Sequence, residues 1–515
     1  MANFYVDATL GDDDDDGTIG EPWQTIAKVN ASSFSAGASI LFKKGETWRE
    51  QLTVPSSGSD GQPVTFGAYG NGDAPKILGS DQLSTWAVYG DAGDNIWSCS
   101  HTGTIYEVWF INASDGKTHW GNPVASAAAC VAEYDWFYDS NVVYCYAASD
   151  PDARYTSVEG AAREYGFKNS AGKAYITVDG LEIAYSYQAC IWFDGSDANH
   201  GIVQNCTLHH TGLYPYSIGY GNGIRNTGAS GLMSGNTIYE CATHGIWIHA
   251  KSAQSCTNSI AQNNTVYNCY HVGIDVWNYF ANATSSGHVV KYNTVYLTAD
   301  YADTAIRCDG IQLYCESTGV LDSCQVYYNV VYNILGHGIG IEKYVTNAAI
   351  KNNSLYKSHA DIGAEVSAGI YVASLGVTGI VIQNNVAVDF VSGCLKVIDK
   401  TDISTCDNNC WYQSAGGTAI YTNVNTISYH YDDQAAYQLA TEWDASGLWE
   451  DPDFTDAAGA DFSLKSTSPC INVGANVGLS VDIEGTSIVG NPDVGAYEYV
   501  SGAVPLNHDV TIRLL

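Results

Sequence analysis

The sequence contains no run of apolar residues long enough to cross a lipid bilayer, which requires about 20 of them. Basic side chains are also scarce, because 21 lysines and arginines accompany 55 aspartates and glutamates, for a net charge of −34. This excess of negative charge argues against nucleic acid or an anionic membrane as a partner. The first residues lack a basic stretch followed by an apolar one, so no signal peptide is visible. We expect an extracellular or virion-associated protein, whose signal peptide has been removed or which leaves its cell by another route, for instance as part of a virion.

Cys-x-x-Cys pairs are absent, although the chain has 15 cysteines. An odd number of cysteines without metal-ligand spacing argues against a disulfide framework and against a metal site built from them. Free thiols buried in the core are the expected arrangement, since a free cysteine behaves as a small hydrophobic residue.

What the sequence does contain is an internal repeat, in which an asparagine and a short strand are followed by Gly-Ile-x-Ile. Successive repeat asparagines lie 24 to 36 residues apart. They are Asn236, Asn264, Asn293, Asn329, Asn353 and Asn385, and the glycines that follow them are Gly245, Gly273, Gly310, Gly338, Gly369 and Gly393. A repeat of this length, with loops of varying size, is typical of a solenoid.

Each part of the repeat has a physical reason. Alternating isoleucines predict a strand with one buried face, and stacked coils would join these faces into one core. Asparagines at the bends can hydrogen-bond from coil to coil, and the glycine is expected to allow a tight turn into the strand. The pattern predicts an all-β fold, a right-handed parallel β-helix, with Ile246, Ile274, Ile311, Ile339 and Ile370 in one buried row.

The repeat does not extend over the whole chain. Residues 1–85 are expected to form an N-terminal cap, with a short amphipathic helix over Trp23–Val29, and the first coils. Residues 86–170 are expected to form an inserted, aromatic-rich β segment. Residues 171–404 are predicted to be the central β-helix with the active face, and 405–515 the last coils and a C-terminal cap.

Several segments carry a resemblance to known proteins: Tyr5–Asp7, Pro22–Ile26, Phe42–Trp48, Tyr175–Leu181 and the closing Asp493–Glu498. Together they resemble bacterial and phage right-handed β-helix proteins, a superfamily of pectin- and alginate-degrading enzymes, β-helical glycosidases and phage tailspike depolymerases. The resemblance covers nearly the whole chain and implies a polysaccharide as partner, with the protein a monomer or a tailspike-like homotrimer. It does not select a reaction, because one fold hosts many activities.

The repeat glycine, taken as position zero, sets which side chains face outward. Positions one and three face the core, whereas positions two and four face solvent. Position two holds Trp192, Arg225, Trp247, Asp275, Gln312, Gly340, Tyr371 and Lys396, and position four holds Asp194, Thr227, His249, Trp277, Tyr314, Glu342 and Ala373. Coils that stack about 4.8 Å apart would align these residues in one strip.

This strip mixes large aromatics with isolated charges of both signs, although aromatics also cover ordinary sheets. Aromatic faces stack on sugar rings, while charged groups bind hydroxyls or carboxylates. We expect Trp247, Trp277 and Tyr314 to contact sugar. The other candidates for substrate binding are Arg225, His249, Lys251, Arg307, Gln312 and Tyr371.

A second set of polar residues precedes the repeat glycine, among them His244, Asp309 and His337. By parity this position points inward, so its polar groups are useful only at a bend. The strings Asp309-Gly310 and Gly336-His337-Gly338 resemble, in order, elements of the polygalacturonases, which implies a catalytic acid at Asp309 with His337 as its neighbour. The paired Asp-Asp and the later Arg-Ile-Lys of that family are missing.

Glycoside hydrolysis is the mechanism that the strip favours slightly. One carboxylic acid protonates the leaving oxygen while a second carboxylate activates water or attacks. The candidates are Asp275, Asp309 and Glu342, with His244 and His337 tuning them. Asp275 and Asp309 lie on adjacent coils and three residues apart in register, a separation that favours inversion.

A polysaccharide lyase is the first alternative. β-Elimination needs a base beside a uronic acid and a cation, or Ca²⁺, that neutralises its carboxylate. His249, Lys251 or Tyr314 could be the base, with Arg225 or Arg307 as the cation. The second alternative is a non-catalytic tail fibre or adhesin that binds glycan through the same strip.

An acidic loop, Gly11–Gly17, resembles a calcium-binding loop superficially. The residue where such a loop needs a bidentate glutamate is Trp23, so a solvated acidic loop is expected. Neither mechanism requires a cofactor, and Ca²⁺ is the one ion that the sequence brings into question.

Overall fold

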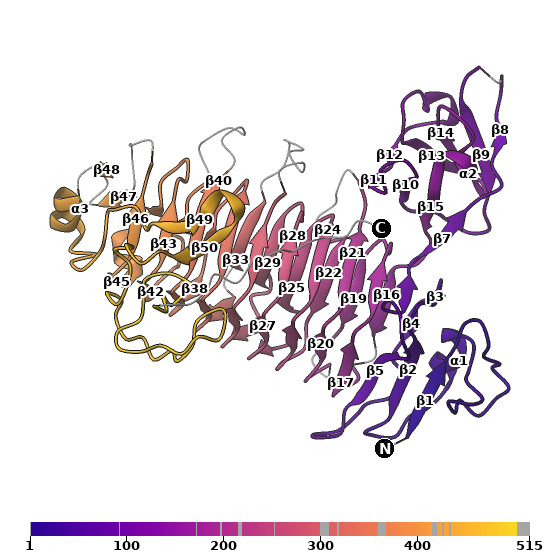
Figure 1. The fold of residues 1–515 in the computed structure, drawn as a ribbon, viewed down its shortest axis with the longest axis horizontal. Helices are drawn as coiled ribbons and strands as arrows, with labels where there is room; N and C mark the ends of the chain where they lie inside the picture. Colours follow the sequence, from indigo (N-terminus) through magenta and orange to yellow (C-terminus); the bar gives the residue numbers. More distant parts are fainter. Residues whose placement is uncertain are drawn as a thin grey trace.

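A computed structural model describes residues 2–91, 93–170, 172–195, 198–214, 219–251, 253–298, 308–316, 319–358, 367–414, 420–424, 427–431 and 434–501. Three long sheets run along the molecule and stack coil upon coil (Figure 1). The structure thus confirms the predicted parallel β-helix. Within the described ranges, every helix is too short or too polar to cross a membrane.

From β2 onward, each coil contributes one strand to each sheet, in the order sheet 1, sheet 2, sheet 3. Sheet 1 comprises β1 (Asn3–Val6), β2 (Ser39–Lys43), β5 (Val64–Tyr69), β17 (Ile176–Asp179), β20 (Ile202–Gln204), β23 (Leu232–Ser234), β27 (Ile260–Gln262), β31 (Val289–Lys291), β35 (Gln325–Tyr327), β39 (Ala349–Lys351), β42 (Ile380–Gln383) and β45 (Ile403–Asp407). Sheet 2 comprises β3 (Thr47–Trp48), β6 (Lys76–Leu78), β18 (Glu182–Ala184), β21 (Thr207–Thr211), β24 (Thr237–Cys241), β28 (Thr265–Tyr267), β32 (Thr294–Tyr296), β36 (Val330–Ile334), β40 (Ser354–Ser358), β43 (Val386–Val388) and β46 (Cys410–Tyr412).

Sheet 3 carries the predicted strip, and its strands are parallel except for the last. It comprises β4 (Leu52–Thr53), β16 (Tyr165–Asn169), β19 (Ala189–Phe193), β22 (Asn222–Asn226), β25 (His244–Ala250), β29 (Val272–Asn278), β33 (Asp309–Cys315), β37 (Ile339–Glu342), β41 (Ile370–Val372), β44 (Leu395–Val397), β47 (Ile420–Val424) and the antiparallel β48 (Ile427–Tyr431). A short fourth sheet joins β26 (Cys256–Thr257), β30 (Thr284–Ser286), β34 (Val320–Asp322) and β38 (Val345–Thr346).

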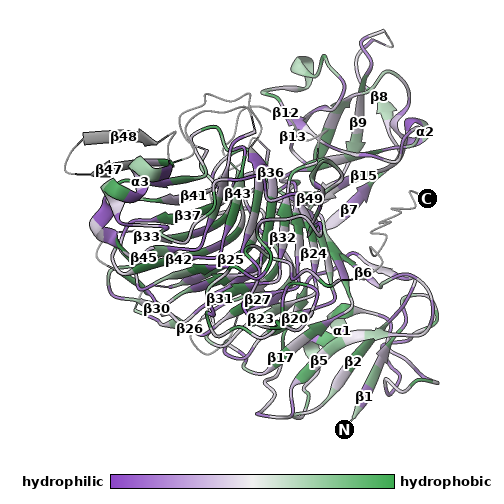
Figure 2. Ribbon diagram, turned by 60° about the vertical axis from the view of Figure 1, so that its left-hand side comes forward, coloured by the Kyte–Doolittle hydropathy of each residue, from purple (hydrophilic) through white to green (hydrophobic). Residues whose placement is uncertain are grey.

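The core follows the predicted register. Ile246, Ile274, Ile311, Ile339 and Ile370 pair from coil to coil in sheet 3, and each is fully buried. Hydrophobic residues run along the stacked strands in Figure 2. All 15 cysteines are free and buried, as expected for thiols that serve as core residues.

The repeat asparagines form a buried ladder at the bend between sheets 1 and 2. The side-chain oxygen of Asn293, for example, accepts hydrogen bonds from both the backbone N and Nδ2 of Asn264, at 3.0 and 2.9 Å. The same pair of bonds recurs from Asn236 to Asn409, where Asp444 Oδ1 accepts the last two. This ladder satisfies polar groups that burial would otherwise leave unpaired.

Five of the six repeat glycines serve packing rather than the expected tight turn. Gly245, Gly273, Gly310, Gly338 and Gly369 have no positive φ, whereas Gly393 has a φ of 101°. A Cβ on Gly310 would lie 2.3 Å from a Val331 methyl group and 2.6 Å from the carbonyl oxygen of Gly338. Glycine is therefore required because the coil has no room for a side chain at this corner.

The inserted segment starts and ends earlier than predicted, and it projects from the N-terminal end of the solenoid (Figure 1). One sheet contains β7 (Ser80–Leu83), β10 (Val108–Asn112), β11 (Thr118–Trp120) and β15 (Tyr155–Ala161); the other contains β8 (Ala87–Val88), β9 (Ile96–Ser100), β12 (Asn122–Pro123), β13 (Asp135–Asp139) and β14 (Val142–Tyr146), with η1 (Ala127–Ala129) and α2 (Pro151–Arg154) between strands. β16, which the sequence had assigned to the insertion, already pairs with β19 in sheet 3.

The two ends are closed by different means. At the N-terminal end, α1 (Ile26–Ala31) buries Ile26 and Val29, close to the predicted helix. At the other end, η2 (Lys400–Asp402) precedes β45 in the last coil, whereas α3 (Gln434–Thr441) follows β48, and its Tyr437 joins the main core. The segment with β49 (Phe454–Asp456), η3 (Ala457–Gly459) and β50 (Asp461–Leu464) instead packs along the side of sheet 2, so the predicted C-terminal cap is only partly a cap.

Candidate functional site

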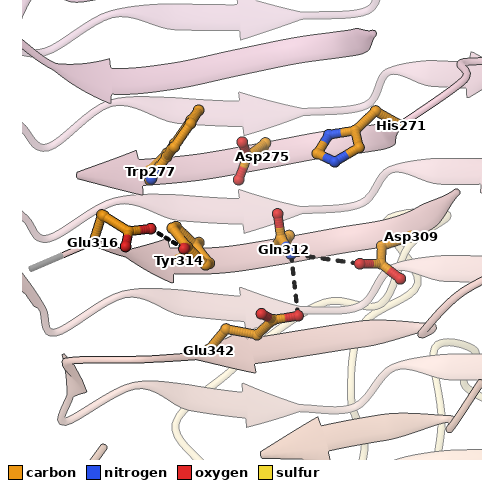
Figure 3. Close-up of a pocket in the computed structure, with 8 residues that line it drawn as sticks. All are labelled: His271, Asp275, Trp277, Asp309, Gln312, Tyr314, Glu316 and Glu342. Carbon is orange, nitrogen blue, oxygen red and sulfur yellow. Dashed lines mark hydrogen bonds between the residues drawn. The ribbon is translucent and has the colours of Figure 1, made fainter. Parts of the chain in front are cut away.

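A cleft of about 330 Å³ opens on sheet 3 above β29, β33 and β37 (Figure 3). Its lining comes from the predicted strip: Asp275 and Gln312 pair at position two, while Trp277, Tyr314 and Glu342 pair at position four. Among the described residues, the lining consists of His271, Asp275, Trp277, Asp309, Gln312, Tyr314, Glu316 and Glu342. Strand parity therefore identified most of this cleft.

Asp309 reaches the same cleft from the position before the repeat glycine. It lies at the start of β33, where the strand leaves the bend, so simple parity does not apply. Its Oδ1 accepts a hydrogen bond from the backbone N of His337 at 2.6 Å, and its Oδ2 accepts one from Gln312 Nε2 at 3.4 Å. These two hydrogen bonds hold the carboxyl group of Asp309 in place.

Gln312 connects two carboxylates. Its Nε2 also donates to Glu342 Oε1 at 3.3 Å, so one amide group holds Asp309 and Glu342 on the two sides of the cleft floor (Figure 3). Because both acceptor oxygens bind the same nitrogen, their separation cannot exceed the sum of the two hydrogen-bond lengths, 3.4 and 3.3 Å.

Asp275 has a different environment from these two. It is only 1 % exposed, and its Oδ1 has no hydrogen-bond partner although the residue lines the cleft. Burial raises the pKa of Asp275 well above its usual value, and the charges of Asp309 and Glu342 raise it further. The cleft therefore contains one carboxyl group that favours the protonated form beside carboxyl groups held by donors.

The contacts of His244 indicate which of its ring nitrogens carries hydrogen. Asn222 Nδ2 donates to the carbonyls of Gln188 and Gly219, which turns its Oδ1 toward His244 Nδ1, 3.0 Å away. An amide oxygen only accepts, so Nδ1 carries the hydrogen and Nε2 of a neutral ring is an acceptor. The hydrogen bond at this Nε2 is the one with His271 Nδ1, at 3.2 Å, and Asp275 Oδ2 lies beside it at 3.4 Å.

The neutral state of His244 is consistent with its surroundings. The ring is fully buried, and burial lowers its pKa well below the usual value, with His271 as a second cause. His271 Nδ1 lies 3.2 Å from His244 Nε2 and lines the cleft. As predicted from the sequence, His244 touches a cleft carboxyl group, although it is not itself part of the cleft wall.

His337 supports the cleft from behind. Besides its backbone bond to Asp309, its ring Nδ1 accepts from the backbone N of Ala368 at 3.0 Å. Tyr371 stacks on the ring at 4.3 Å between centroids, so this tyrosine, a predicted binding residue, is engaged by the protein.

Two cleft residues were not singled out from the sequence, His271 and Glu316. Tyr314 O–H donates to Glu316, and Lys343 Nζ lies 3.0 Å from that hydroxyl. Both missed residues lie at strand ends: His271 precedes β29, and Glu316 follows β33. The repeat offered a signal for His271, which stands two residues before the glycine, one place before the polar set at the bend.

Trp247 corrects the predicted sugar-binding strip. It is 6 % exposed, because its ring stacks against His244 at 4.9 Å and against His249 at 4.1 Å. It therefore supports the neighbouring side chains rather than offering a free face. Trp277 and Tyr314 are partly exposed and line the cleft.

The predicted basic residues lie on the coils before the cleft. Arg225 packs over Trp247 and its Nε donates to His249 Nε2 at 3.0 Å, whereas Lys251 forms an ion pair with Asp194. The structure thus brings these residues together beside the cleft, not into its lining. Arg307 lies outside the described residues.

Metal ligands do not converge in the described part of the chain, where no three His, Cys, Asp or Glu side chains form a metal-binding group. In the acidic loop, Asp13 Oδ1 accepts from the backbone N of Gln24 and Thr25, at 2.9 and 3.0 Å. Lys28 Nζ donates to the backbone carbonyl oxygen of Asp13 at 2.6 Å. This part of the loop thus fastens the N-terminal helix.

Comparisons with known proteins place the fold. Residues 166–320 match the family described as "Right handed beta helix region". Among solved structures, the complex of XylC with xylose is similar at a TM-score of 0.63 and 15 % identity, covering 97 % of this chain and 98 % of that one. Pectate lyase Pel9A is similar at 0.54 and 14 %, covering 97 % and 96 %. A glycoside hydrolase is similar at 0.50 and 9 %, covering 82 % and 94 %.

A curated protein, the uncharacterized protein YwoF of Bacillus subtilis (strain 168), is 38 % identical over 61 residues. These residues make up 12 % of this chain and 13 % of YwoF, so the chain matches only a small part of that protein's length. At these identities the likeness concerns the fold, a right-handed parallel β-helix that carbohydrate-active hydrolases and lyases share.

Proposed function

We propose that the protein hydrolyses glycosidic bonds of a polysaccharide that lies along sheet 3, with Asp275 as the general acid. The observation that carries this proposal is the environment of Asp275, which lines the cleft but is buried, has an unpaired Oδ1 and lies close to the charges of Asp309 and Glu342. A carboxylic acid that stays protonated near neutral pH can protonate the oxygen of the leaving sugar.

The second carboxyl group of the mechanism comes from the pair on Gln312. Asp309 and Glu342 both accept from its amide, and Asp309 also accepts from a backbone N–H. Hydrogen bonds of this kind orient a carboxyl group, as the role of base or nucleophile requires. We assign this role to Asp309, which is held by the two donors, and a supporting charge to Glu342.

The lyase candidates are occupied by other contacts. Burial lowers the pKa of His249 to about 3, and Arg225 already donates to its Nε2. Lys251 is paired with Asp194, while burial and the bond to Glu316 raise the pKa of Tyr314. Each group is therefore a poor proton acceptor where it stands, which favours hydrolysis over β-elimination.

Similarity in fold to the complex of XylC with xylose and to a glycoside hydrolase supports sugar as the ligand. Similarity to pectate lyase Pel9A keeps β-elimination as the outcome that a test must separate. A panel of purified polysaccharides would be incubated with the protein, with new reducing ends and the ultraviolet absorbance of unsaturated products measured together. We expect reducing ends without that absorbance.

Asp275→Asn and Asp309→Asn should each lower the rate by about a thousandfold while circular dichroism stays unchanged. Asp179→Asn is a matched control, because Asp179 ends β17 in sheet 1, away from the cleft. Unsaturated products, or full activity in both cleft variants, would contradict the proposal. Tight binding of a glycan that is not cleaved would favour the adhesin.

A further inference from the structure

Three basic side chains surround the ring of Trp192, on the coils before the cleft. The charged groups of Lys168, Arg225 and Lys251 lie 5.5, 5.2 and 5.6 Å from the ring centroid. The whole chain has only 21 lysines and arginines against 55 acidic residues. Such a concentration of positive charge on an acidic protein marks a place where an anion would be attracted locally.

Arg225 is held so that its guanidinium group has a defined orientation. It packs over two rings, Trp192 at 5.2 Å and Trp247 at 4.8 Å. Its Nε donates to His249 Nε2 at 3.0 Å. His249 Nδ1 lies 3.1 Å from the carbonyl oxygen of Ala250, so Nδ1 is the donor and Nε2 the acceptor of a neutral ring.

The remaining nitrogens of Arg225 are not used by an ion pair within the described residues. Lys251 is paired with Asp194 and Lys168 with Glu164, at 3.5 Å for the latter, whereas Arg225 has no carboxylate partner there. Burial disfavours the charged form of Arg225 and so lowers its pKa. An anion paired with the guanidinium group would offset this cost of burying the charge. The planar pair of N–H donors matches a carboxylate in two parallel bonds.

The register relates this arginine to the catalytic acid. Arg225 pairs with Trp247, and Trp247 pairs with Asp275, all at position two of sheet 3. The two backbones are therefore two coil spacings apart, about 10 Å. A polysaccharide lying across the coils would reach both residues with neighbouring sugars.

We propose that Arg225 binds the anionic group, carboxylate or sulfate, of an acidic sugar next to the bond that is cleaved. This assigns the substrate to acidic polysaccharides, and its link to cleavage rests on the proposed hydrolase. The bound carboxylate lies outside the acidic cleft. Inside the cleft, the charges of Asp309 and Glu342 would repel it. His249 is a positioning residue, because it acts through the guanidinium group.

Binding is measured by calorimetry with Asp275→Asn, so that cleavage does not interfere, on polygalacturonate, alginate and hyaluronan, on their carboxyl-reduced forms, and on dextran sulfate and dextran. We expect a charged polymer to bind, and the addition of Arg225→Gln to weaken it about 10- to 100-fold. Arg225→Lys, which keeps the charge but not the planar donors, should lie between the two.

Lys291→Gln is the matched control, because Lys291 lies on β31 of sheet 1 and removing it deletes the same charge elsewhere. A loss confined to uronic polymers assigns the carboxylate, and a loss confined to dextran sulfate assigns the sulfate. Equal binding of the charged and uncharged forms, no binding of any charged polymer, or no effect of Arg225→Gln overturns the subsite.

The same variants separate this proposal from the hydrolase. If no polymer is cleaved but Arg225→Gln still removes charge-dependent binding, the subsite stands without the hydrolase. If an acidic polymer is cleaved and Arg225→Gln changes neither its KM nor its affinity, the hydrolase stands and the subsite is refuted.

Discussion

Replacing Asn222 with aspartate should move a proton at the proposed catalytic acid without touching the cleft. Asn222 Oδ1 lies 3.0 Å from His244 Nδ1, and His244 Nε2 lies 3.4 Å from Asp275 Oδ2. Asn222→Asp keeps the shape of the side chain but places a negative charge against the ring. That charge favours the imidazolium form of His244, and the positive ring, 3.4 Å from Asp275 Oδ2, then favours the carboxylate of Asp275.

The size of the effect follows from the charges. An opposite charge within 4–6 Å shifts a pKa by about 1–3 units, here downward for Asp275. The new carboxylate itself lies farther from Asp275 and offsets part of this shift, so we expect a net decrease of about 1 unit. At pH values above the pKa, lowering the pKa of Asp275 by 1 unit reduces its protonated fraction about tenfold.

The sign of the pH dependence follows from the raised pKa. Burial, Asp309 and Glu342 keep Asp275 protonated to higher pH, so activity should be lost as pH rises through that pKa. In Asn222→Asp this alkaline limb should move about 1 pH unit toward acid. Above the limb, kcat/KM would be about tenfold lower than in the native protein, and well below it nearly unchanged.

The assay is kcat/KM against pH on whichever polymer the panel identifies. Asn199→Asp is the control, since Asn199 follows β19 and its Oδ1 accepts only from the backbone N of Ala229, outside the cleft. An alkaline limb that stays in place in correctly folded Asn222→Asp would refute the coupling between the charge of His244 and the pKa of Asp275.

Other consequences are simpler to state. Trp277→Ala should weaken glycan binding by about 1–3 kcal/mol with little loss of stability, whereas Trp247→Ala, which removes a buried stacked ring, should destabilise the fold by about 3–5 kcal/mol in urea unfolding. Burial raises the pKa of Glu240 from 4.5 to about 7, so the folded state is destabilised at higher pH, where the carboxyl group would ionise. Glu240→Gln should therefore stabilise the protein by about 1–2 kcal/mol above pH 7, but not below pH 4.5, in thermal melts. Gly310→Ala should cost about 1–3 kcal/mol because its Cβ would meet Val331, while Gly20→Ala, with open space around it, should be near neutral in the same urea titration.

The sequence was informative where parity holds. A strand alternates its side chains with a period of two, so a glycine that marks the register predicts every outward residue of that strand. In this way the sequence predicts correctly that Asp275, Gln312 and Glu342 face outward, on the three coils that form the cleft. The buried asparagine ladder followed equally well, because each bend requires the same hydrogen bonds in every coil.

Parity fails at the strand ends and says nothing of burial. His271 and Glu316 lie beyond the regular part of β29 and β33, where the bend decides the direction of a side chain. Trp247 was placed at the right position, but its neighbours His244 and His249 cover it, and two strands must be stacked before such a contact is visible.

Lys168 was missed for a different reason. Lys168 pairs with Trp192 and lies two residues after Gly166, which is position two of the repeat. A Cβ on Gly166 would lie 2.1 Å from Ile183, so this glycine is as crowded as the other repeat glycines. The segment Gly166-Phe167-Lys168 has aromatic rather than isoleucine character, so it was counted with the insertion. Likewise, residues 454–496 have no repeat of their own, and their packing on sheet 2 depends on long-range contacts alone.

The separation between the basic subsite and the acidic cleft bears on the choice of reaction. β-Elimination removes a proton beside a uronic carboxylate, so the neutralising cation and the base must meet on one sugar. Here Arg225 and Asp275 are two coils apart, and the described cleft lining has four carboxyl groups but neither lysine nor arginine. A uronic acid held by Arg225 would present its neighbour's glycosidic oxygen, not its own acidic proton, to Asp275. Oligosaccharides released from an acidic polymer should then carry saturated ends, and mass spectrometry that found unsaturated ends would refute this division of roles.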